Sequence, residues 1–172
     1  MKKQVIFWLL IMITKCVYAQ SWNNVGLGMV GGGPTSLNSF EKLYIGVNCS
    51  GTCNFSGVPV DGIVTLSGND IDTLGSGVFG YVNDAAWFNG KLIVGGNIFC
   101  ADIPPDCIPF TQNIAAWDSL TGWSSITPSG GTNTNIQCME VYNNEIYIGG
   151  MMTTVDGISC NRMAKYNGTS WS

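Results

Sequence analysis

The residues of this 172-residue chain best suited to chemistry are its cysteines and aspartates, because it contains no histidine. Without histidine, a Ser-His-Asp triad, a Cys-His pair and a His-ligated zinc, copper or haem site are excluded within the chain. Six of its seven cysteines follow one another as Cys49, Cys53, Cys100, Cys107, Cys138 and Cys160. Such pairs can form disulfides, and the Cys-x3-Cys spacing of the first two also suits a metal site.

Two pairs of aspartates lie close together in the sequence, at Asp70 with Asp72 and at Asp102 with Asp106. Paired carboxylates are the groups that glycoside hydrolysis requires. Both pairs lie in turn-like stretches, where aspartate commonly bonds the local backbone. We therefore assign neither pair a catalytic role, and no residue is predicted to be catalytic or to bind a cofactor or a metal.

Two Asp-Gly dipeptides, Asp61-Gly62 and Asp156-Gly157, occur in equivalent loops and could contribute to a weak calcium site. Ordinary turn formation explains them equally simply and is the interpretation we favour. The run Gly31–Gly33 does not predict a phosphate-binding loop, because no Lys-Ser/Thr pair follows it and no helix is predicted there.

The first 19 residues have the pattern of a cleavable signal peptide. Lys2 and Lys3 precede an unbroken apolar run over 5–13, which is short for a membrane span. Val17 and Ala19 provide the small residues expected before a cleavage site, so cleavage is predicted after Ala19. The alternative is an uncleaved membrane anchor. The pattern predicts a secreted or cell-surface protein, not inserted in the membrane once the signal is removed.

Charge limits the possible partners. The chain has 7 basic and 11 acidic residues, and removal of residues 1–19 leaves four basic residues, for a net charge of −7. Such a surface repels nucleic acid and anionic lipid. The same cleavage removes Cys16 and leaves an even number of cysteines, as expected for disulfides in an oxidising compartment.

A repeat of about fifty residues runs through the remaining chain. An apolar strand ending in glycine recurs at Leu43–Gly46, Leu92–Gly96 and Ile146–Gly150. Tryptophan recurs at Trp22, Trp123 and Trp171, with Ile71 in the intermediate position. A period of this length indicates a repeat architecture. We divide the chain into units of roughly 20–70, 71–122 and 123–172.

Each unit reads as four short antiparallel strands. In the second unit, strands are predicted over 82–88, 91–96, 113–117 and 123–126, with a tight hairpin turn at Asn89-Gly90. In the third, they are predicted over 136–142, 145–150 and 162–166, and then at Trp171. No helical period occurs, so the chain is predicted to be all-β.

The glycine and aromatic residues of these units resemble the kelch-like, galactose-oxidase-type repeats of secreted bacterial proteins. The motif is a glycine pair, an aromatic residue and then a tryptophan, carried by Gly95, Gly96, Trp117 and Trp123 and again by Gly149, Gly150, Tyr166 and Trp171. The first unit has Gly46-Val47 in place of the pair, as is common in terminal repeats. The resemblance implies β-propeller blades of four antiparallel strands, about three of them, with the aromatic residues as core rather than ligand contacts. It implies no activity.

Three blades are fewer than a closed propeller contains. We therefore expect 20–172 to be the N-terminal part of a longer propeller, whose remaining blades are supplied in cis. The alternative is a three-unit protein that completes a ring by oligomerising.

Cys49 and Cys53, and likewise Cys100 and Cys107, fall in the loops that follow the glycine strands of units one and two, which predicts short-range disulfides. The most economical pairing is Cys49 with Cys53 and Cys100 with Cys107, which leaves Cys138 with Cys160. Six cysteines allow fifteen connectivities, so position in the sequence does not fix the pairing.

We expect a binding or adhesion module whose partner is a protein or glycan at the cell surface, because propellers present loops on a rigid scaffold. One alternative is the propeller part of a secreted enzyme whose catalytic residues lie outside this chain. Another is a structural surface protein. The copper site of galactose oxidase is excluded because this chain has no histidine.

Overall fold

The computed structural model describes residues 29–39, 42–68, 70–102 and 105–172, and these residues form β-strands and no helix. The prediction of an all-β chain is therefore confirmed. The predicted signal peptide, its cleavage site and Trp22 lie outside the described residues. None of the described residues belongs to a helix of the length and apolarity that a membrane span needs.

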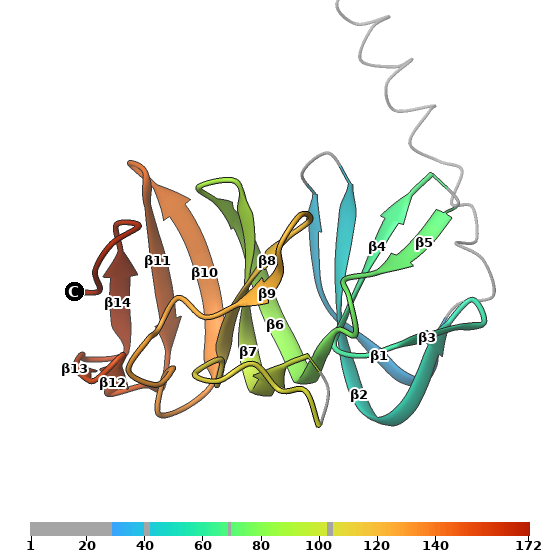
Figure 1. The fold of residues 1–172 in the computed structure, drawn as a ribbon, viewed down its shortest axis with the longest axis horizontal. Helices are drawn as coiled ribbons and strands as arrows, with labels where there is room; N and C mark the ends of the chain where they lie inside the picture. The colour runs from blue at the N-terminus through green and yellow to red at the C-terminus, as the bar shows by residue number, and fades with distance from the viewer. Residues whose placement is uncertain (1–28, 40–41, 69, 103–104) are drawn as a thin grey trace, which may run out of the picture.

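The strands form three successive antiparallel groups, which we call units 1, 2 and 3 (Figure 1). Unit 1 has the order β1 (Met29–Ser39), β2 (Leu43–Phe55), β4 (Ile63–Ser67) and β5 (Asp70–Thr73), and β3 (Val58–Val60) pairs with the end of β2. Unit 2 has the order β6 (Val78–Phe88), β7 (Lys91–Ala101), β8 (Ile114–Asp118) and β9 (Gly122–Ser124). Unit 3 has the order β10 (Ile136–Tyr142), β11 (Glu145–Gly150) and β14 (Met163–Tyr166), with a side hairpin of β12 (Thr154–Val155) and β13 (Ile158–Ser159).

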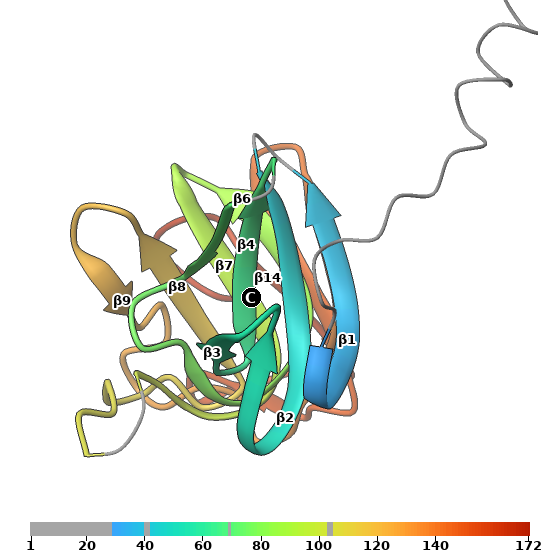
Figure 2. The ribbon, with the colours of Figure 1, turned by 90° about the vertical axis from the view of Figure 1, so that its right-hand side faces the viewer.

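Units 1 and 2 are joined through the single pair Asn48–Tyr81, so their strands form one nine-stranded sheet. That sheet is curled, with the two halves facing each other, and the sheet of unit 3 packs on the far side of unit 2. Viewed along the stack, the sheets lie one behind another (Figure 2).

The three units share one register. The first glycine of each glycine motif faces the start of the third strand, in the pairs Gly46–Ile63, Gly95–Ile114 and Gly149–Met163. The end of the third strand faces the recurring Trp or Ile position, in the pairs Leu66–Ile71, Trp117–Trp123 and Tyr166–Trp171. Residues of different units can therefore be aligned position by position without any appeal to sequence similarity.

A backbone hydrogen bond repeats at the same place in each unit. The residue before the third strand has a positive φ of 64–66° and its carbonyl accepts an N–H from the second strand, as Gly62 from Val47, Asn113 from Gly96 and Arg162 from Gly150. Glycine and asparagine adopt this conformation readily, whereas arginine at this position is uncommon.

Each first strand carries a bulge opposite its glycine motif, at Pro34–Ser36, Val82–Asp84 and Ile136–Cys138. A bulge leaves one residue outside the ladder and redirects its side chain. In the first two units that side chain bonds the next unit, because the Thr35 hydroxyl donates to the Val82 carbonyl and the Asn83 amide donates to the Ile136 carbonyl (2.7 Å). These bonds tie successive first strands together.

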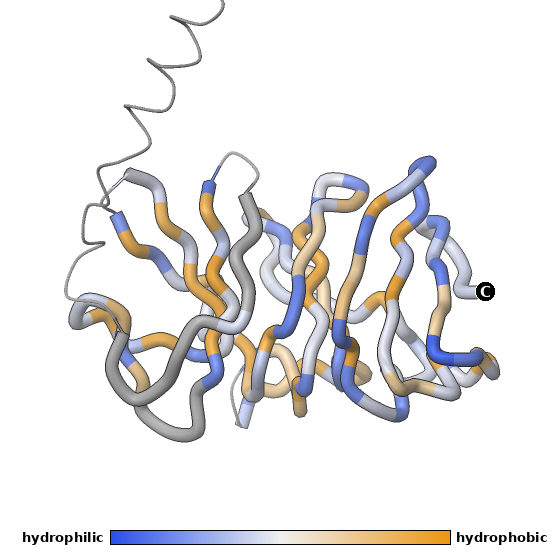
Figure 3. Tube along the Cα trace, turned by 180° about the vertical axis from the view of Figure 1, so that it is seen from behind, coloured by the Kyte–Doolittle hydropathy of each residue, from blue (hydrophilic) through white to orange (hydrophobic). Residues whose placement is uncertain are grey.

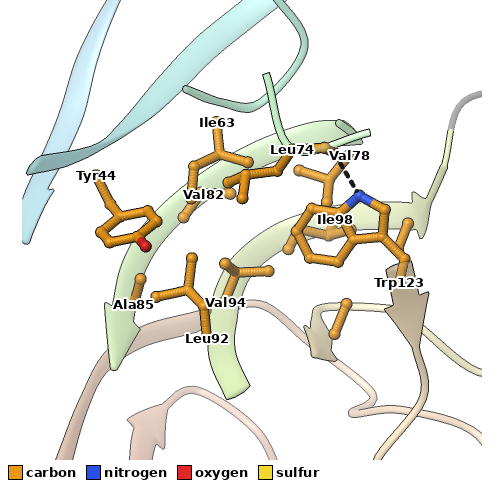
Figure 4. Close-up of a cluster of buried hydrophobic side chains, with 12 residues drawn as sticks. Tyr44, Ile63, Leu74, Val78, Val82, Ala85, Leu92, Val94, Ile98 and Trp123 are labelled. Carbon is orange, nitrogen blue, oxygen red and sulfur yellow. Dashed lines mark hydrogen bonds between the residues drawn. The ribbon is translucent and has the colours of Figure 1, made fainter. Parts of the chain in front are cut away.

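The core lies between the sheets. Because successive side chains of a strand point to opposite faces, the core is divided into separate clusters on the two faces of unit 2. On β7, Leu92 and Val94 belong to a cluster shared with unit 1, whereas Ile93 between them belongs to a cluster shared with unit 3. Figure 4 shows the first cluster, in which Tyr44 and Ile63 of unit 1 meet the unit 2 side chains. Figure 3 shows hydrophobic residues recurring along the strands of the stack. Because both faces of unit 2 are covered here, three consecutive residues of β7, Leu92, Ile93 and Val94, are apolar and buried.

Unit 1 covers its own outer face. Ile45, Val47 and Val64 point away from unit 2 and pack with Cys53, Phe55 and Val60, from the curled end of β2 and from β3. The outer face of unit 1 is therefore covered by an apolar cluster formed within unit 1 itself.

Candidate functional site

The recurring tryptophans join the end of a unit to its beginning. The Trp123 indole donates to the Leu74 carbonyl (2.7 Å), which lies just before β6 (Figure 4). The Trp171 indole donates in the same way to the Ile126 carbonyl (2.9 Å), before β10. Both rings are buried, and each stacks on or tilts against the aromatic residue opposite it, Trp117 or Tyr166. These aromatic residues hold the scaffold together.

The glycine pair of unit 2 is required by close packing. A Cβ at Gly96 would lie 1.9 Å from the Tyr81 carbonyl oxygen, and one at Gly95 would lie 2.4 Å from Cε of Met139 in unit 3. In unit 3, a Cβ at Gly150 would lie 2.6 Å from the Asn135 carbonyl oxygen. Gly46 occupies the corresponding buried position of unit 1.

Three of the four paired aspartates are exposed, and the fourth, Asp102, is half-buried. Asp70 and Asp72 are exposed on β5, and Asp106 is exposed in the loop after β7. Asp102 accepts a hydrogen bond from the Ser76 hydroxyl (2.6 Å), which fixes the turn before β6. Asp102 therefore has a structural role in this turn.

The two Asp-Gly dipeptides also lie in turns. The Asp61 carbonyl accepts the N–H of Val78, and burial raises the pKa of its carboxyl group. The Asp156 carboxylate accepts the N–H of Ser129. Among the residues that the structure describes, no group of three or more Cys, Asp or Glu side chains is placed to hold a metal ion.

The cysteine prediction is right for one pair and wrong for another. Cys100 and Cys107 form a disulfide, as predicted. Cys53 is disulfide-bonded, but the side chain of its predicted partner Cys49 lies outside the described residues. Cys138 and Cys160 are free thiols, so the predicted bond between them is absent.

The sheet explains why Cys138 and Cys160 do not meet. Cys138 faces Gly149 on one side of β11, whereas the segment that carries Cys160 runs along the other side, where its N–H bonds the Thr153 carbonyl. Thr153 lies beyond the end of β11, so the two cysteines are separated both across β11, where neighbouring strands are about 4.8 Å apart, and along its direction. Disulfides join Cα atoms that are at most about 7 Å apart.

A pocket of about 140 Å³ opens between units 2 and 3. Its apolar lining comes from Phe88, Ile93 and Ile126, and its polar lining from Asn89, Lys91 and Tyr166. The β6–β7 hairpin contributes Asn89, which has a positive φ of 50° in the tight turn before Gly90. The site therefore depends on two elements far apart in the sequence, the hairpin of unit 2 and the end of β14.

Tyr166 is the aromatic wall of this pocket. Its ring stacks on Trp171 with centroids 5.0 Å apart and meets the edge of Phe88 at 6.1 Å. Burial, and to a lesser extent the charge of Asp156, raises the pKa of its hydroxyl. The hydroxyl therefore stays protonated at neutral pH and is available as a hydrogen-bond donor.

Sequence reasoning placed Tyr166 among the structural aromatics and did not identify Asn89 or Lys91 as site residues. A signal was present, because the fifty-residue repeat aligns Ile93 with the larger Tyr44. A smaller side chain at an equivalent interface position indicates either a cavity or compensation by a neighbour.

Two exposed phenylalanines form a second surface feature. Phe79 and Phe99 are 48% and 61% exposed, and their ring centroids lie 5.3 Å apart. Phe79 faces Cys100 across β6 and β7, so this aromatic pair lies beside the Cys100–Cys107 loop. Exposed aromatic residues of this kind are enriched at binding surfaces.

A charged network lies on the outer face of unit 3. Lys165 Nζ is 3.0 Å from both carboxylate oxygens of Glu145, and the Tyr147 hydroxyl donates to the same carboxylate (3.0 Å). The hydrogen bonds from Lys165 and then from Tyr147 lower the pKa of Glu145. The network is solvent-accessible, with the two charged side chains 41% and 25% exposed.

The chain matches no protein-family model, and no curated protein matches it.

Proposed function

We propose that units 1 to 3 are blades of a kelch-like β-propeller-type repeat module. The shared register, the repeated bulges and the two Trp-to-carbonyl bonds support this proposal, because each recurs at equivalent positions. The bulge residue of unit 3 is Gln137, which is exposed. Since Thr35 and Asn83 each bond the next unit, Gln137 is the donor we expect to bond any further unit stacked on unit 3.

We infer that this module is exported and binds a protein or glycan at a cell surface. The observation that carries the proposal is the pocket at the junction of two rigid units, together with the exposed Phe79–Phe99 pair. A stack fixed by inter-unit hydrogen bonds holds such features in constant geometry without reorganisation on binding.

Binding can be tested with the protein purified from the medium of an expressing cell. A mass matching Gln20 as the first residue would support export with cleavage after Ala19. The purified protein is then applied to a glycan array and to intact cells, and a variant with Phe79→Ser and Phe99→Ser serves as the comparison. Saturable binding by the wild-type protein supports the proposal, and weaker binding by the variant assigns it to the aromatic pair. Absence of saturable binding to both targets would overturn it.

A further inference from the structure

The pocket between units 2 and 3 exists because of side-chain size. The shared register makes Ile93 equivalent to Tyr44, and Tyr166 equivalent to Trp117. It likewise makes Val141 equivalent to Trp87. At the junction of units 1 and 2, the Tyr44 ring packs edge-on against Trp87 with centroids 5.9 Å apart, and Tyr44 is only 7% exposed. At the junction of units 2 and 3, smaller side chains take all three positions.

The polar groups of the pocket are suited to an anion. Lys91 lines it, and no described carboxylate forms an ion pair with this lysine. Asn89 and Tyr166, which also line the pocket, carry an amide and a hydroxyl that can donate hydrogen bonds. No acidic residue is among the described residues that line the pocket, although Asp156 lies near enough for its charge to act on the Tyr166 hydroxyl. A carboxylate is the ligand group that this set of donors would bind most tightly. The reason is that hydrogen bonds between a cation and a carboxylate are stronger than those between neutral groups.

The apolar groups and the volume limit the rest of the ligand. Phe88, Ile93 and Ile126 provide the apolar walls, and the ring of Tyr166 provides a flat one. The volume of about 140 Å³ is close to that of the roughly 150 Å³ engineered cavity known to bind benzene. This pocket is open on one side, and its volume accommodates one six-membered ring.

We propose that this pocket binds a six-membered ring that carries a carboxylate, with the acid at Lys91 and the ring between Ile93 and Tyr166. The proposal rests on the binding function proposed above and names the ligand class for one of its two features. Two sources supply this chemistry, the uronic acids of polysaccharides and small aromatic acids. The shared requirement is one ring and one negative charge.

The test is ligand-observed NMR on the full chain with two matched pairs of probes. Glucuronate is compared with glucose, and benzoate with benzyl alcohol. For one ring and one ion pair we expect a Kd of about 1 mM, with the acid of at least one pair binding about tenfold more tightly than its neutral partner. The pair that shows the difference identifies the source. Equal binding of acid and neutral probe in both pairs, or no binding of either acid, would overturn the proposal.

Three variants assign the binding to this pocket. Lys91→Gln should reduce acid binding about tenfold and leave neutral probes unchanged, and Lys91→Arg should restore it. Lys42→Gln is the matched control, because Lys42 is exposed in unit 1 and its loss changes the net charge equally. Ile93→Tyr should abolish binding of every probe, because it installs the side chain that unit 1 carries at this position. Retention of acid binding by Lys91→Gln or by Ile93→Tyr places it elsewhere and contradicts the proposal.

The same variants separate this proposal from the general function. If the wild-type protein binds cells or glycans and Ile93→Tyr binds them equally well, the pocket proposal fails while the binding function stands. If the wild-type protein binds neither but shows Lys91-dependent acid binding, the pocket proposal stands and the surface-binding function fails. Thermal unfolding of each variant confirms that the fold is intact.

Discussion

The same sheet face has opposite surroundings in units 2 and 3. In unit 2 the face is covered by unit 3 and carries Ile93, Ile114 and Ala116, all buried. At the equivalent positions unit 3 carries Tyr147, Met163 and Lys165, and Met163 is 64% exposed. One backbone register therefore supports two surfaces, and the side chains alone decide whether a neighbouring sheet is required.

The first strands of units 2 and 3 show the same difference between a covered and an uncovered face. Asp84 of unit 2 accepts the backbone N–H of Met139 across the junction (2.7 Å), and Cys138 occupies the equivalent position of unit 3 as an exposed free thiol. Ala86 and Phe88 correspond to Glu140 and Tyr142. The apolar covered face gives stability to the stack, whereas the polar face of unit 3 is compatible with water.

The largest expected difference between the two faces concerns the first residue of the third strand. Ile114→Ala should lower the free energy of unfolding by about 3 kcal/mol, because it removes a fully buried side chain from a packed core. Met163→Ala, at the equivalent position, should change it by less than about 0.5 kcal/mol. Urea denaturation of both variants measures the two values. Similar losses would mean that the face of unit 3 is covered in solution.

The second comparison concerns the hydrogen bond across the junction. Asp84→Ala should cost about 2 kcal/mol, because it leaves the Met139 N–H without its charged acceptor. Cys138→Ala should be nearly neutral, since that thiol is exposed. Asp84→Asn retains an acceptor oxygen and should recover part of the loss. An Asp84→Ala protein as stable as the wild type would show that this bond does not stabilise the junction.

The third comparison concerns the glycines opposite these residues. A Cβ at Gly95 would lie 2.4 Å from Cε of Met139 and 2.9 Å from Cγ2 of Ile136, so Gly95→Ala should cost about 1–2 kcal/mol by overpacking the junction. A Cβ at Gly149 would lie within 3 Å of only the Cys138 sulfur, an exposed side-chain end that can rotate away. Gly149→Ala should therefore cost less, and a smaller loss for Gly95→Ala than for Gly149→Ala contradicts this view of the two faces.

Features carried by residues close in sequence were predictable. Asn89-Gly90 predicts a tight turn because both residues accept positive φ, and β6 and β7 meet there. The predicted strands over 136–142 and 145–150 coincide with β10 and β11. Turn chemistry and apolar runs are local properties, so these two hairpins could be predicted from the chain alone, whereas the side hairpin of β12 and β13 was not predicted.

Features that depend on contacts between distant residues were not predictable. Pairing Cys138 with Cys160 by elimination ignored β11, which lies between them. The repeat already aligned Ile93 with Tyr44, but the pocket also required knowledge that Tyr166 lies beside the hairpin of unit 2. The bonds from Thr35 and Asn83 required the positions of the bulges, which the sequence does not mark. Register between strands, rather than strand content, was the missing information.

The smallest expected effect on stability comes from the ion pair between Lys165 and Glu145. It lies on the face of unit 3 that corresponds to the apolar, covered face of unit 2. The pKa of Glu145 is lowered from its ordinary value of 4.5 and that of Lys165 is raised above 10.5, each chiefly by the hydrogen bond to the other. A carboxyl group with a lowered pKa stabilises the fold above its ordinary pKa, and this contribution is lost as the pH falls and the group is protonated. The pair therefore contributes at neutral pH and ceases to do so in acid. Its effect is small because both side chains are in contact with solvent.

Lys165→Ala tests this, because alanine is the residue that unit 2 carries at the equivalent Ala116. We expect the variant to melt slightly below the wild type at pH 7, and the gap to close as the pH falls below about 4.5 and Glu145 is protonated in both proteins. Lys42→Gln, which removes an exposed lysine from unit 1, should show no comparable pH-dependent gap. If Lys165→Ala instead raises the melting temperature and promotes self-association, the alanine allows this face to pack against another copy of the protein, as the face of unit 2 packs against unit 3. The ion pair would then act mainly to keep the face of unit 3 open, which would sharpen the contrast between the two faces.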